Sequence, residues 1–446
     1  MTANKHIAIA GGGLVGSLLA VYLSKRGYRV DIFERRSDMR QENIDGGRSI
    51  NLALSNRGLK ALNDVGIIEG IERIAIPMHG RMIHALDKTL TFQPYGRNGQ
   101  FINSISRSSL NTLLISTAEK LGAKFHFDHR IIQVDLHHST LIYEVKGKEF
   151  RKTYDAIAGA DGAFSAVRLA MQFTDRFDFS QDYIEHGYKE LEIPPGKSGE
   201  FVMEPNALHI WPRESFMLIA LPNPGGSFTC TLFFPFEGKT SFSSLKSDES
   251  IINFFKEYFP DACVLMPQLL GDFNTNPAAS LVTMKSYPWV RNRTLIIGDA
   301  AHAIVPFYGQ GMNAGFEDCR ILNMLLNQYD DNWEKAITTF QSQRKADTDA
   351  IAELALDNFV EMRDLVADKE FLLRKKIEAR LNVLYPERWI PLYSMVTFHH
   401  DIRYSEAQRI GAKQKQIMDD VMALPGIEST WEHLDFEQLV QKLQAT

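Results

Sequence analysis

The stretch HIAIAGGGLVGSLLAVYLSKRGYRVDIFE, residues 6–34, decides the fold of this chain. Residues 6–10 and 29–33 are short apolar runs that predict buried strands, and residues 14–26 between them predict a helix. A strand, a helix and a second strand in immediate succession form a βαβ unit. The sequence therefore predicts that the chain opens with an α/β fold.

The helix of this unit starts in a glycine-rich turn, GGGLVG, which fits the pattern G-x-G-x-x-G over residues 11–16. Glycines at these places permit a tight turn, close approach of the backbone to a pyrophosphate and close packing of the helix on the strand. Glu34 ends the second strand, 18 residues beyond Gly16, where a carboxylate can accept hydrogen bonds from ribose hydroxyls. A turn without a ligand does not explain that acid, so the unit predicts a dinucleotide site.

Bulk composition limits the other possibilities. The chain has 446 residues, enough for about three domain-sized units. It is 44% hydrophobic and 23% charged, as is usual for a soluble globular protein, and its formal charge of −6 argues against a general nucleic-acid binder. Cys230, Cys263 and Cys319 lie far apart without the spacing of a metal site, and we interpret them as reduced thiols of a cytosolic protein.

Neither end of the chain predicts a targeting or membrane segment. Four glycines interrupt the apolar run at 7–23 and a strand follows at once, so we interpret this run as part of the fold and not as a signal peptide. No stretch approaches the ~20 consecutive apolar residues of a membrane span. The charged tail from Arg403 onward gives no anchor. We expect a soluble, cytoplasmic protein without a membrane span.

A second glycine-rich segment, GDAAHAIVPFYGQGMNAGFEDC at 298–319, follows the apolar run TLIIG. Asp299 comes directly after the expected strand, and a helix is expected to begin near Met312 and Asn313. Such a helix start presents unpaired N–H groups and the positive end of a dipole. A structural turn before a helix is the alternative. A third signal at the end of a strand, GADGAFSAVR, occupies residues 159–168.

These three signals together resemble the single-component flavoprotein aromatic hydroxylases, over about residues 5–400. The resemblance implies bound FAD, with the ADP half at the first turn, Asp161, Gly162 and Arg168 supporting the cofactor region, and Asp299 at the ribityl chain. Long stretches that are not Rossmann-like argue against a third alternative, an NAD dehydrogenase. The cofactor contacts that we predict are Gly11, Gly13, Val15, Gly16, Phe33, Glu34, Arg35, Arg36, Ala53, Arg107, Asp299, Gly311, Met312 and Asn313.

Two of these predictions rest partly on local chemistry. Arg107 lies where a helix starts, and the helix dipole disfavours a cation there, so a pyrophosphate partner would resolve the tension. A solvated surface arginine is the alternative. The helix that begins near Met312 would face the flavin atoms on which negative charge develops during reduction. We expect Phe307 and Tyr308 beside the flavin ring, and we interpret His302 as structural and not as a base.

The resemblance implies a discontinuous fold. We predict an α/β fold with a Rossmann-like FAD-binding domain, an inserted antiparallel β-sheet substrate domain and a helical C-terminal region. β-rich runs between about 180 and 290, separated by Pro, Gly and Asn, support the inserted sheet. The predicted limits are residues 1–180 with 291–330 for the FAD-binding domain, with 75–105 contributing to the substrate side, 181–290 for the substrate domain and 331–446 for the helical region.

Further segments have no role in generic FAD binding. GRSINLALSNRG at 47–58, EPNALHIWPR at 204–213 and IPLYSMVTF at 390–398 resemble members of this family that hydroxylate L-kynurenine. Animal members of that kind carry a C-terminal membrane helix, which this sequence lacks. The resemblance assigns substrate binding to Arg81, Tyr95, Asn358 and Tyr393, with the first two at the carboxylate. From the residues alone, Arg81 could be a surface residue of a strand, Asn358 a solvated helix residue, and the tyrosines core residues.

The resemblance also implies the reaction. NADPH would reduce FAD transiently, molecular oxygen would form a C4a-hydroperoxyflavin, and L-kynurenine would become 3-hydroxy-L-kynurenine. Because the flavin carries the chemistry, we predict no catalytic side chain and no metal, and the protein places the substrate and excludes water. Two alternatives stay open. A related FAD hydroxylase acting on a phenolic acid should lack the segments at 81–84 and 390–398, and a non-catalytic FAD-binding protein should show no substrate-stimulated NADPH oxidation. The sequence indicates no oligomeric state.

Overall fold

The computed structural model describes residues 5–41, 51–96, 99–361 and 369–444, so residues 47–50 of the segment 47–58 lie outside the described residues. The predicted βαβ unit is confirmed: β1 spans His6–Ala10, α1 spans Leu14–Lys25 and β2 spans Arg29–Phe33. The helix expected to start at Arg107 is also present, as α4 at Arg107–Lys120. Local apolar periodicity was sufficient to predict these elements, because each buries one continuous face.

A six-stranded sheet of the described residues forms the Rossmann-like part of the fold, in the order β18-β19-β12-β1-β2-β8. All neighbouring pairs are parallel except β18 with β19. Because parallel strands end at the same edge, the segments that follow β1, β12 and β19 meet there, and these are the three motifs of the sequence. Besides β1 and β2, the sheet contains β8 (Lys124–His126), β12 (Ala156–Gly159), β18 (Val290–Arg291) and β19 (Thr294–Ile296).

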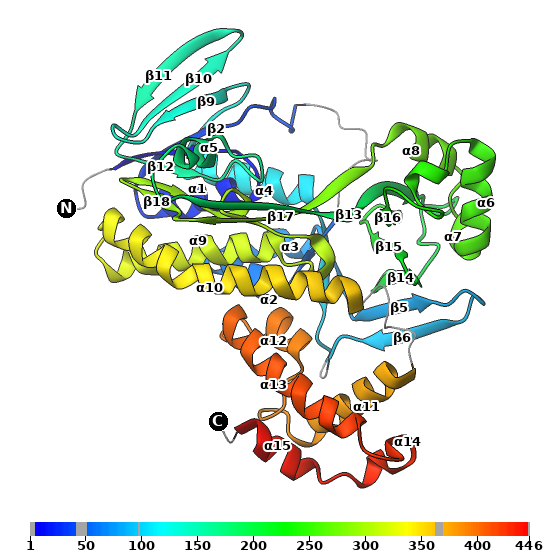
Figure 1. Cartoon of the computed structure of the whole chain (residues 1–446). Coiled ribbons are helices and arrows are strands. Elements are labelled where there is room, and N and C mark those ends of the chain that lie inside the picture. The colour runs from blue at the N-terminus through cyan, green and yellow to red at the C-terminus, as the bar shows by residue number, and fades with distance from the viewer. Residues whose placement is uncertain (1–4, 42–50, 97–98, 362–368, 445–446) are drawn as a thin grey trace.

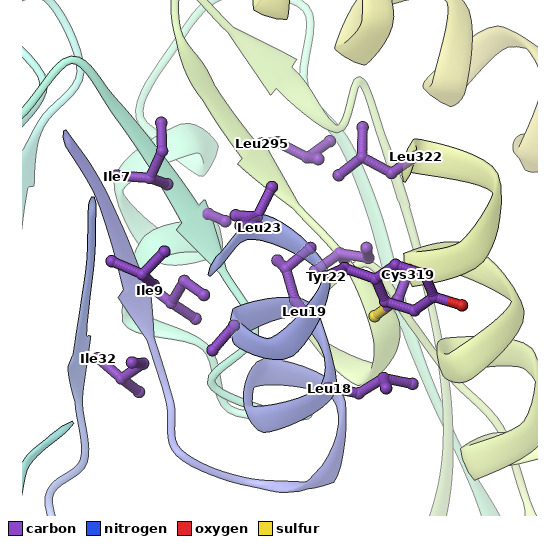
Figure 2. Packing of buried hydrophobic residues seen from close by; sticks show 14 of the residues in the cluster. Ile7, Ile9, Leu18, Leu19, Tyr22, Leu23, Ile32, Leu295, Cys319 and Leu322 are labelled. Carbon is purple, nitrogen blue, oxygen red and sulfur yellow. The ribbon is translucent and has the colours of Figure 1, made fainter. Parts of the chain in front are cut away.

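Helices cover this sheet and bury its apolar core. Figure 2 shows Leu19 and Leu23 of α1 beside Ile7 and Ile9 of β1, and Cys319 on α9 (Gly311–Gln328) close to Tyr22 of α1. The Tyr22 hydroxyl donates a hydrogen bond of 2.7 Å to the Ala61 carbonyl, so even this polar atom has a partner. The core of the Rossmann-like part is therefore continuous from the sheet through α1 to α9.

An eight-stranded sheet forms the second layer, in the order β20-β17-β13-β16-β15-β14-β5-β6. Its neighbouring pairs are antiparallel except β14 with β5, which confirms the predicted antiparallel sheet. Strands β5 and β6 reach this sheet from the first quarter of the chain (Figure 1). The strands are β5 (Gly80–His84), β6 (Leu90–Pro94), β13 (Asp178–Ile193), β14 (Ala207–Arg213), β15 (Phe216–Pro222), β16 (Phe228–Pro235), β17 (Ala279–Tyr287) and β20 (His302–Ala303).

The other elements complete the two layers. Helices α6 (Asp248–Tyr258), α7 (Pro260–Cys263) and α8 (Leu269–Thr275) gather beside the eight-stranded sheet, and the sequence did not predict them (Figure 1). The domain limits stay a prediction. The remaining elements before residue 180 are β3 (Asn51–Leu54), α2 (Asn56–Asp64), α3 (Ile68–Glu72), β4 (Ala75–Met78), β7 (Ile102–Ser106), β9 (Arg130–Asp135), β10 (Thr140–Val145), β11 (Lys148–Thr153) and α5 (Ala166–Gln172).

The C-terminal part of the chain is helical, as predicted. The long helix α10 packs against α9 and α13, and the later helices gather below them in Figure 1. None of the helices in the described part of the chain is long and apolar enough to cross a membrane. The helices are α10 (Trp333–Val360), α11 (Lys369–Leu384), α12 (Leu392–Phe398), α13 (Tyr404–Met422), α14 (Ile427–Thr430) and α15 (Phe436–Gln444).

Val15 joins the two glycine-rich segments by packing against two glycines. A Cβ atom added to Gly315 of α9 would lie 2.6 Å from Val15 Cγ2, and one added to Gly298 would lie 3.1 Å from both Val15 γ-carbons. The Cys319 thiol also donates to the Val15 carbonyl over 3.5 Å. The missing side chains therefore let the N-terminal ends of α1 and α9 approach each other.

We expect Gly315→Ala to lower the free energy of unfolding by about 1–3 kcal/mol, because a Cβ forced against Val15 overpacks a rigid site. This loss should exceed the ~1 kcal/mol by which alanine favours a helix over glycine. Urea unfolding followed by circular dichroism measures it. Gly271→Ala is the control: its new Cβ meets nothing nearer than 3.6 Å at an exposed position of α8, so it should stabilise. Equal effects of the two substitutions would contradict the packing at Val15.

Candidate active site

A cavity of about 820 Å³ is lined by residues from both sheets and from the start of α9. That volume lies in the upper part of the range for ligand sites. Gly16, Asn313 and Asn358, which the sequence assigned to the site, do not line it. The predicted residues that line it are Gly11, Gly13, Val15, Phe33, Glu34, Arg35, Arg36, Ala53, Arg81, Tyr95, Arg107, Asp299, Gly311, Met312 and Tyr393.

The first glycine turn forms one end of the cavity. Gly11 has a φ of +97°, and a Cβ there would lie 2.5 Å from the Ala160 carbonyl oxygen, so only glycine fits. A Cβ at Gly13 would meet nothing within 4 Å, which leaves the backbone open toward a ligand. No side chain caps the N-terminus of α1 at Gly13, so the first N–H groups of the helix remain available for an anion. This geometry fits a pyrophosphate.

Gly16 has a packing role in α1. A Cβ at this position would lie 2.0 Å from the Gly11 carbonyl oxygen, so glycine is required for α1 to pack against the turn. Glu34 also has a structural task that the sequence did not predict. One carboxylate oxygen accepts the Gly12 N–H over 2.9 Å, and the other accepts the Arg36 N–H over 3.0 Å. A carboxylate has about four acceptor sites, so Glu34 can hold the turn and still accept ribose hydroxyls.

The second glycine-rich segment forms the middle of the cavity wall. Gly309 has a φ of +65°, and no side chain caps the start of α9 at Gln310. The fully buried Asn313 lies behind this wall: its Nδ2 donates to the carbonyls of Ala53 and Gly309, each over 2.8 Å, and its Oδ1 accepts the Ser55 N–H over 2.9 Å. Asn313 therefore fixes the shape of the turn.

Asp299 faces the cavity. Its side chain is accessible from the cavity, and the protein that surrounds it raises the pKa of its carboxyl by burial, against the opposing effects of His302 and Arg107. A carboxylate that has lost part of its hydration is stabilised by hydroxyl groups that donate hydrogen bonds to it in place of water. Asp299 and the N-terminus of α9 thus offer an acceptor and a set of donors on one wall.

His302 lies outside the cavity lining, and a buried carboxylate holds its ring in place. Its Nε2 lies 2.6 Å from Asp318 Oδ2, and the same carboxylate accepts from Arg344 Nε over 2.8 Å. Burial tends to raise the pKa of Asp318, but His302 and Arg344 outweigh this effect and hold it below the usual value. The contacts agree with a structural role for His302.

Arg81 lies at the other end of the cavity, among tyrosines. Its Cζ lies 4.6 Å from the centre of the Tyr393 ring and 5.7 Å from that of Tyr95, and these two rings stack with centroids 5.8 Å apart. Among the described residues no carboxylate forms an ion pair with Arg81, and its buried Nε has no hydrogen-bond partner. Burial lowers the pKa of the guanidinium, but Tyr393, Tyr95 and Glu361 together more than compensate, so it stays charged.

Asn358 contributes to the site indirectly. Its Nδ2 donates to the Phe307 carbonyl over 2.7 Å, and Phe307 stacks on Phe359 with ring centroids 4.1 Å apart. Phe307 and Tyr308 line the cavity, and Tyr308 stacks on Tyr393 with centroids 5.4 Å apart. Asn358 therefore holds an aromatic wall from behind.

The strand that carries Arg81 is fastened by a chain of buried polar contacts. His84 Nδ1 lies 2.6 Å from Asp261 Oδ2, and His84 Nε2 lies 2.8 Å from His209 Nδ1. The other ring nitrogen of His209 lies 2.8 Å from the Glu204 carbonyl oxygen. Burial lowers the pKa of His209 to about 4, whereas hydrogen bonds from His84 and Trp211 outweigh burial and lower the pKa of Asp261 to about 2.

The apolar wall of the cavity was missed from the sequence. In β15, Met217, Ile219 and Leu221 line the cavity, while Phe216 and Leu218 pack into the apolar core on the other face of the sheet. Alternation is a structural fact here, but both faces are apolar, so the sequence shows a continuous hydrophobic run. Glu190 on β13 also lines the cavity, and only its place in a strand could have indicated it.

Comparisons with known proteins agree with this geometry. A family model described as an FAD binding domain matches residues 4–355. The chain is 49% identical to a kynurenine 3-monooxygenase of Christiangramia forsetii and to one of Flavobacterium johnsoniae, over 99% of each chain in both cases. It is 48% identical to a kynurenine 3-monooxygenase of Dictyostelium discoideum, over 94% of this chain and 93% of the relative.

Solved structures share the fold. The tetrameric form of 2-methyl-3-hydroxypyridine-5-carboxylic acid oxygenase superposes with a TM-score of 0.67 at 20% identity, over 83% of this chain and 96% of that one. P. aeruginosa PqsL in complex with 2-aminobenzoylacetate gives a TM-score of 0.65 at 18% identity, over 81% of this chain and 97% of that one. At these identities the likeness is one of fold.

We expect Asp299→Ala to weaken FAD binding roughly 2- to 150-fold, the effect of losing about 0.5–3 kcal/mol of hydrogen bonding. Titration of the apoprotein with FAD measures the dissociation constant. An unchanged constant would show that Asp299 does not contact the cofactor.

Asp299→Asn should at the same time stabilise the apoprotein at neutral pH. A carboxyl whose pKa is raised by folding costs stability once the pH exceeds its unfolded pKa, and asparagine does not ionise. The melting temperature of the variant should therefore exceed that of the wild type at pH 7, and the difference should vanish at a pH below the ordinary carboxyl pKa. A variant that melts lower than the wild type at pH 7 would contradict the assigned environment.

Proposed function

The chain belongs to the kynurenine 3-monooxygenase family of FAD-dependent aromatic hydroxylases, and from this premise we propose that it converts L-kynurenine to 3-hydroxy-L-kynurenine. NADPH is the reductant in this proposal, and molecular oxygen is the co-substrate. The enzyme is an FAD-dependent hydroxylase, and the site residues fit that cofactor. Bound FAD supplies the redox chemistry that activates oxygen, so the side chains bind, orient and exclude water.

The observation that carries the proposal is the guanidinium of Arg81, which lines the cavity and forms no ion pair with a carboxylate among the described residues. A buried cation without a partner is costly, and an incoming carboxylate would relieve that cost. Arginine presents a planar fork of donors that matches a carboxylate, and it stays charged. An amino-acid substrate supplies such a carboxylate.

The tyrosines around Arg81 suit the rest of such a substrate. Burial raises the pKa of Tyr95 and of Tyr308, so both hydroxyls remain neutral hydrogen-bond donors. Tyr393 completes a stack with Tyr95 and with Tyr308. A carboxylate held here would place an attached aromatic ring among the apolar side chains of β15 and β16, against the wall of Phe307.

The proposal needs no side chain that removes a proton from the ring. The amino group of kynurenine donates electron density to the carbon that is hydroxylated, so no phenolate has to be made first. His302 is held by Asp318 outside the cavity lining, which leaves it unable to reach a substrate. The backbone N–H groups at the start of α9 would stabilise negative charge on the bound cofactor, and the apolar wall would exclude water.

We expect Arg81→Ala to weaken kynurenine binding about ten- to over a hundredfold, because a charged hydrogen bond of this kind contributes about 1.5–3 kcal/mol. Arg81→Lys should recover only part of the affinity, because a point charge cannot reproduce the fork. The FAD content should stay normal in both variants. Flavin absorbance and NADPH oxidation, titrated with L-kynurenine, measure the change.

Arg73→Ala is a matched control, since it removes an exposed arginine that does not line the cavity. A phenolic acid serves as the comparison substrate. If the wild type, Arg81→Ala and Arg73→Ala bind kynurenine with the same affinity, Arg81 does not bind the substrate carboxylate. Faster NADPH oxidation with the phenolic acid than with kynurenine would favour the alternative hydroxylase.

A further inference from the structure

Arg57 on α2 is an arginine in the protein interior whose donors face backbone carbonyls. Its exposed fraction is 1%. Nε donates to the Val396 carbonyl over 2.9 Å, and Nη2 lies 3.4 Å from the Met395 carbonyl oxygen and 3.2 Å from that of His399. Nη2 also contacts the Ile402 carbonyl oxygen. The last carbonyls of a helix have no partner within it, so Arg57 supplies the donors that the C-terminal end of α12 lacks.

The same guanidinium reaches α9 on its other side. Nη1 forms an ion pair with Glu317 Oε1 at 2.8 Å, and the other oxygen of Glu317 lies 2.9 Å from Arg344 Nη1 on α10. The Tyr404 ring lies 4.0 Å from the Arg57 Cζ, in the range of a cation–π contact. Arg57 therefore fixes α12 relative to α9 from behind the cavity.

These two helices carry opposite parts of the site. Tyr393, beside Arg81, is the second residue of α12, and Gly311 at the cavity wall is the first residue of α9. We propose that Arg57 is a positioning residue for the substrate: by holding the C-terminal end of α12, it sets the place of Tyr393 against Arg81. This inference rests on the proposed function, because it assumes that the substrate binds at Arg81.

The effect should fall on the substrate more than on the cofactor, because the two helices differ in their other anchors. Helix α9 is held independently by Arg344 through Asp318, at 2.8 Å, and by Asn313 through Ser55, at 2.9 Å. At the C-terminal end of α12, the one further side-chain donor among the described residues is Asn56, whose Nδ2 donates to the Phe398 carbonyl over 3.0 Å. When Arg57 is removed, α9 keeps its hydrogen bonds to Arg344 and Ser55, whereas the C-terminal end of α12 keeps the single hydrogen bond from Asn56.

The test compares variants of the holoenzyme at positions 56, 57 and 60. We expect Arg57→Lys to raise the KM for L-kynurenine about 5- to 30-fold, as the loss of one or two hydrogen bonds would. The dissociation constant for FAD should stay within about twofold, and hydrogen exchange of residues 392–402 should accelerate. Asn56→Ala should shift KM and exchange in the same direction but less, and Arg57→Ala more than Arg57→Lys.

Lys60→Ala is the control on the same helix, because the Lys60 ammonium pairs with Asp64 over 2.8 Å and, among the described residues, forms no hydrogen bond or ion pair with α12. If Arg57→Ala does not fold, Arg57→Lys and Asn56→Ala still decide the matter. A lower melting temperature with unchanged KM and unchanged exchange of 392–402 would overturn the proposal and leave Arg57 a purely structural residue. If the wild type does not hydroxylate kynurenine, the proposed function fails, whereas unaltered exchange in Arg57→Lys overturns the positioning role itself.

Discussion

The contact of Val15 with Gly298 and Gly315 sets the distance between the two helix N-termini that face the cavity, and the remaining site geometry depends on it. If any of these glycines carried a side chain, α1 and α9 would have to separate. On its far side α9 is held by buried charges, with Arg57, Arg344 and Asp318 among them. A buried pair adds little net stability, but loss of one partner costs about 3–5 kcal/mol. Packing therefore sets the distance, and the ion pairs set the orientation.

The cavity is built in two different ways along its length. At the end where we expect the cofactor, backbone groups of glycine turns and helix starts, whose positions follow from the fold, lie beside charged side chains such as Glu34 and Asp299. At the substrate end we expect the ligand to meet side chains, those of Arg81 and the tyrosines around it. Solved structures at about 20% identity share the fold, and a shared fold does not by itself fix the substrate.

The sequence was informative where a pattern is local. The unit at 6–33, the helix at 107–120 and the start of α9 each follow from neighbouring residues. Other features depend on residues that only the fold brings together. These are the parallel pairing of β14 with β5, the packing of Gly16 against Gly11 and the hydrogen bonds of Asn313 to Ser55 and its neighbours. Helices α6 to α8 were missed because they lie among β-rich runs, and β15 shows no alternation because both its faces are apolar.

The contacts that fasten β5 also fix a number of protons. Asp261 and the Glu204 carbonyl are both acceptors, and two imidazoles, His84 and His209, stand between them with three contacts in a row. Three hydrogen bonds need three protons, whereas two neutral imidazoles carry only two. A complete row therefore needs one proton more than two neutral rings supply, and burial disfavours that proton on His209. The strand of Arg81 is thus fastened by a row of contacts whose number depends on how many protons the row holds.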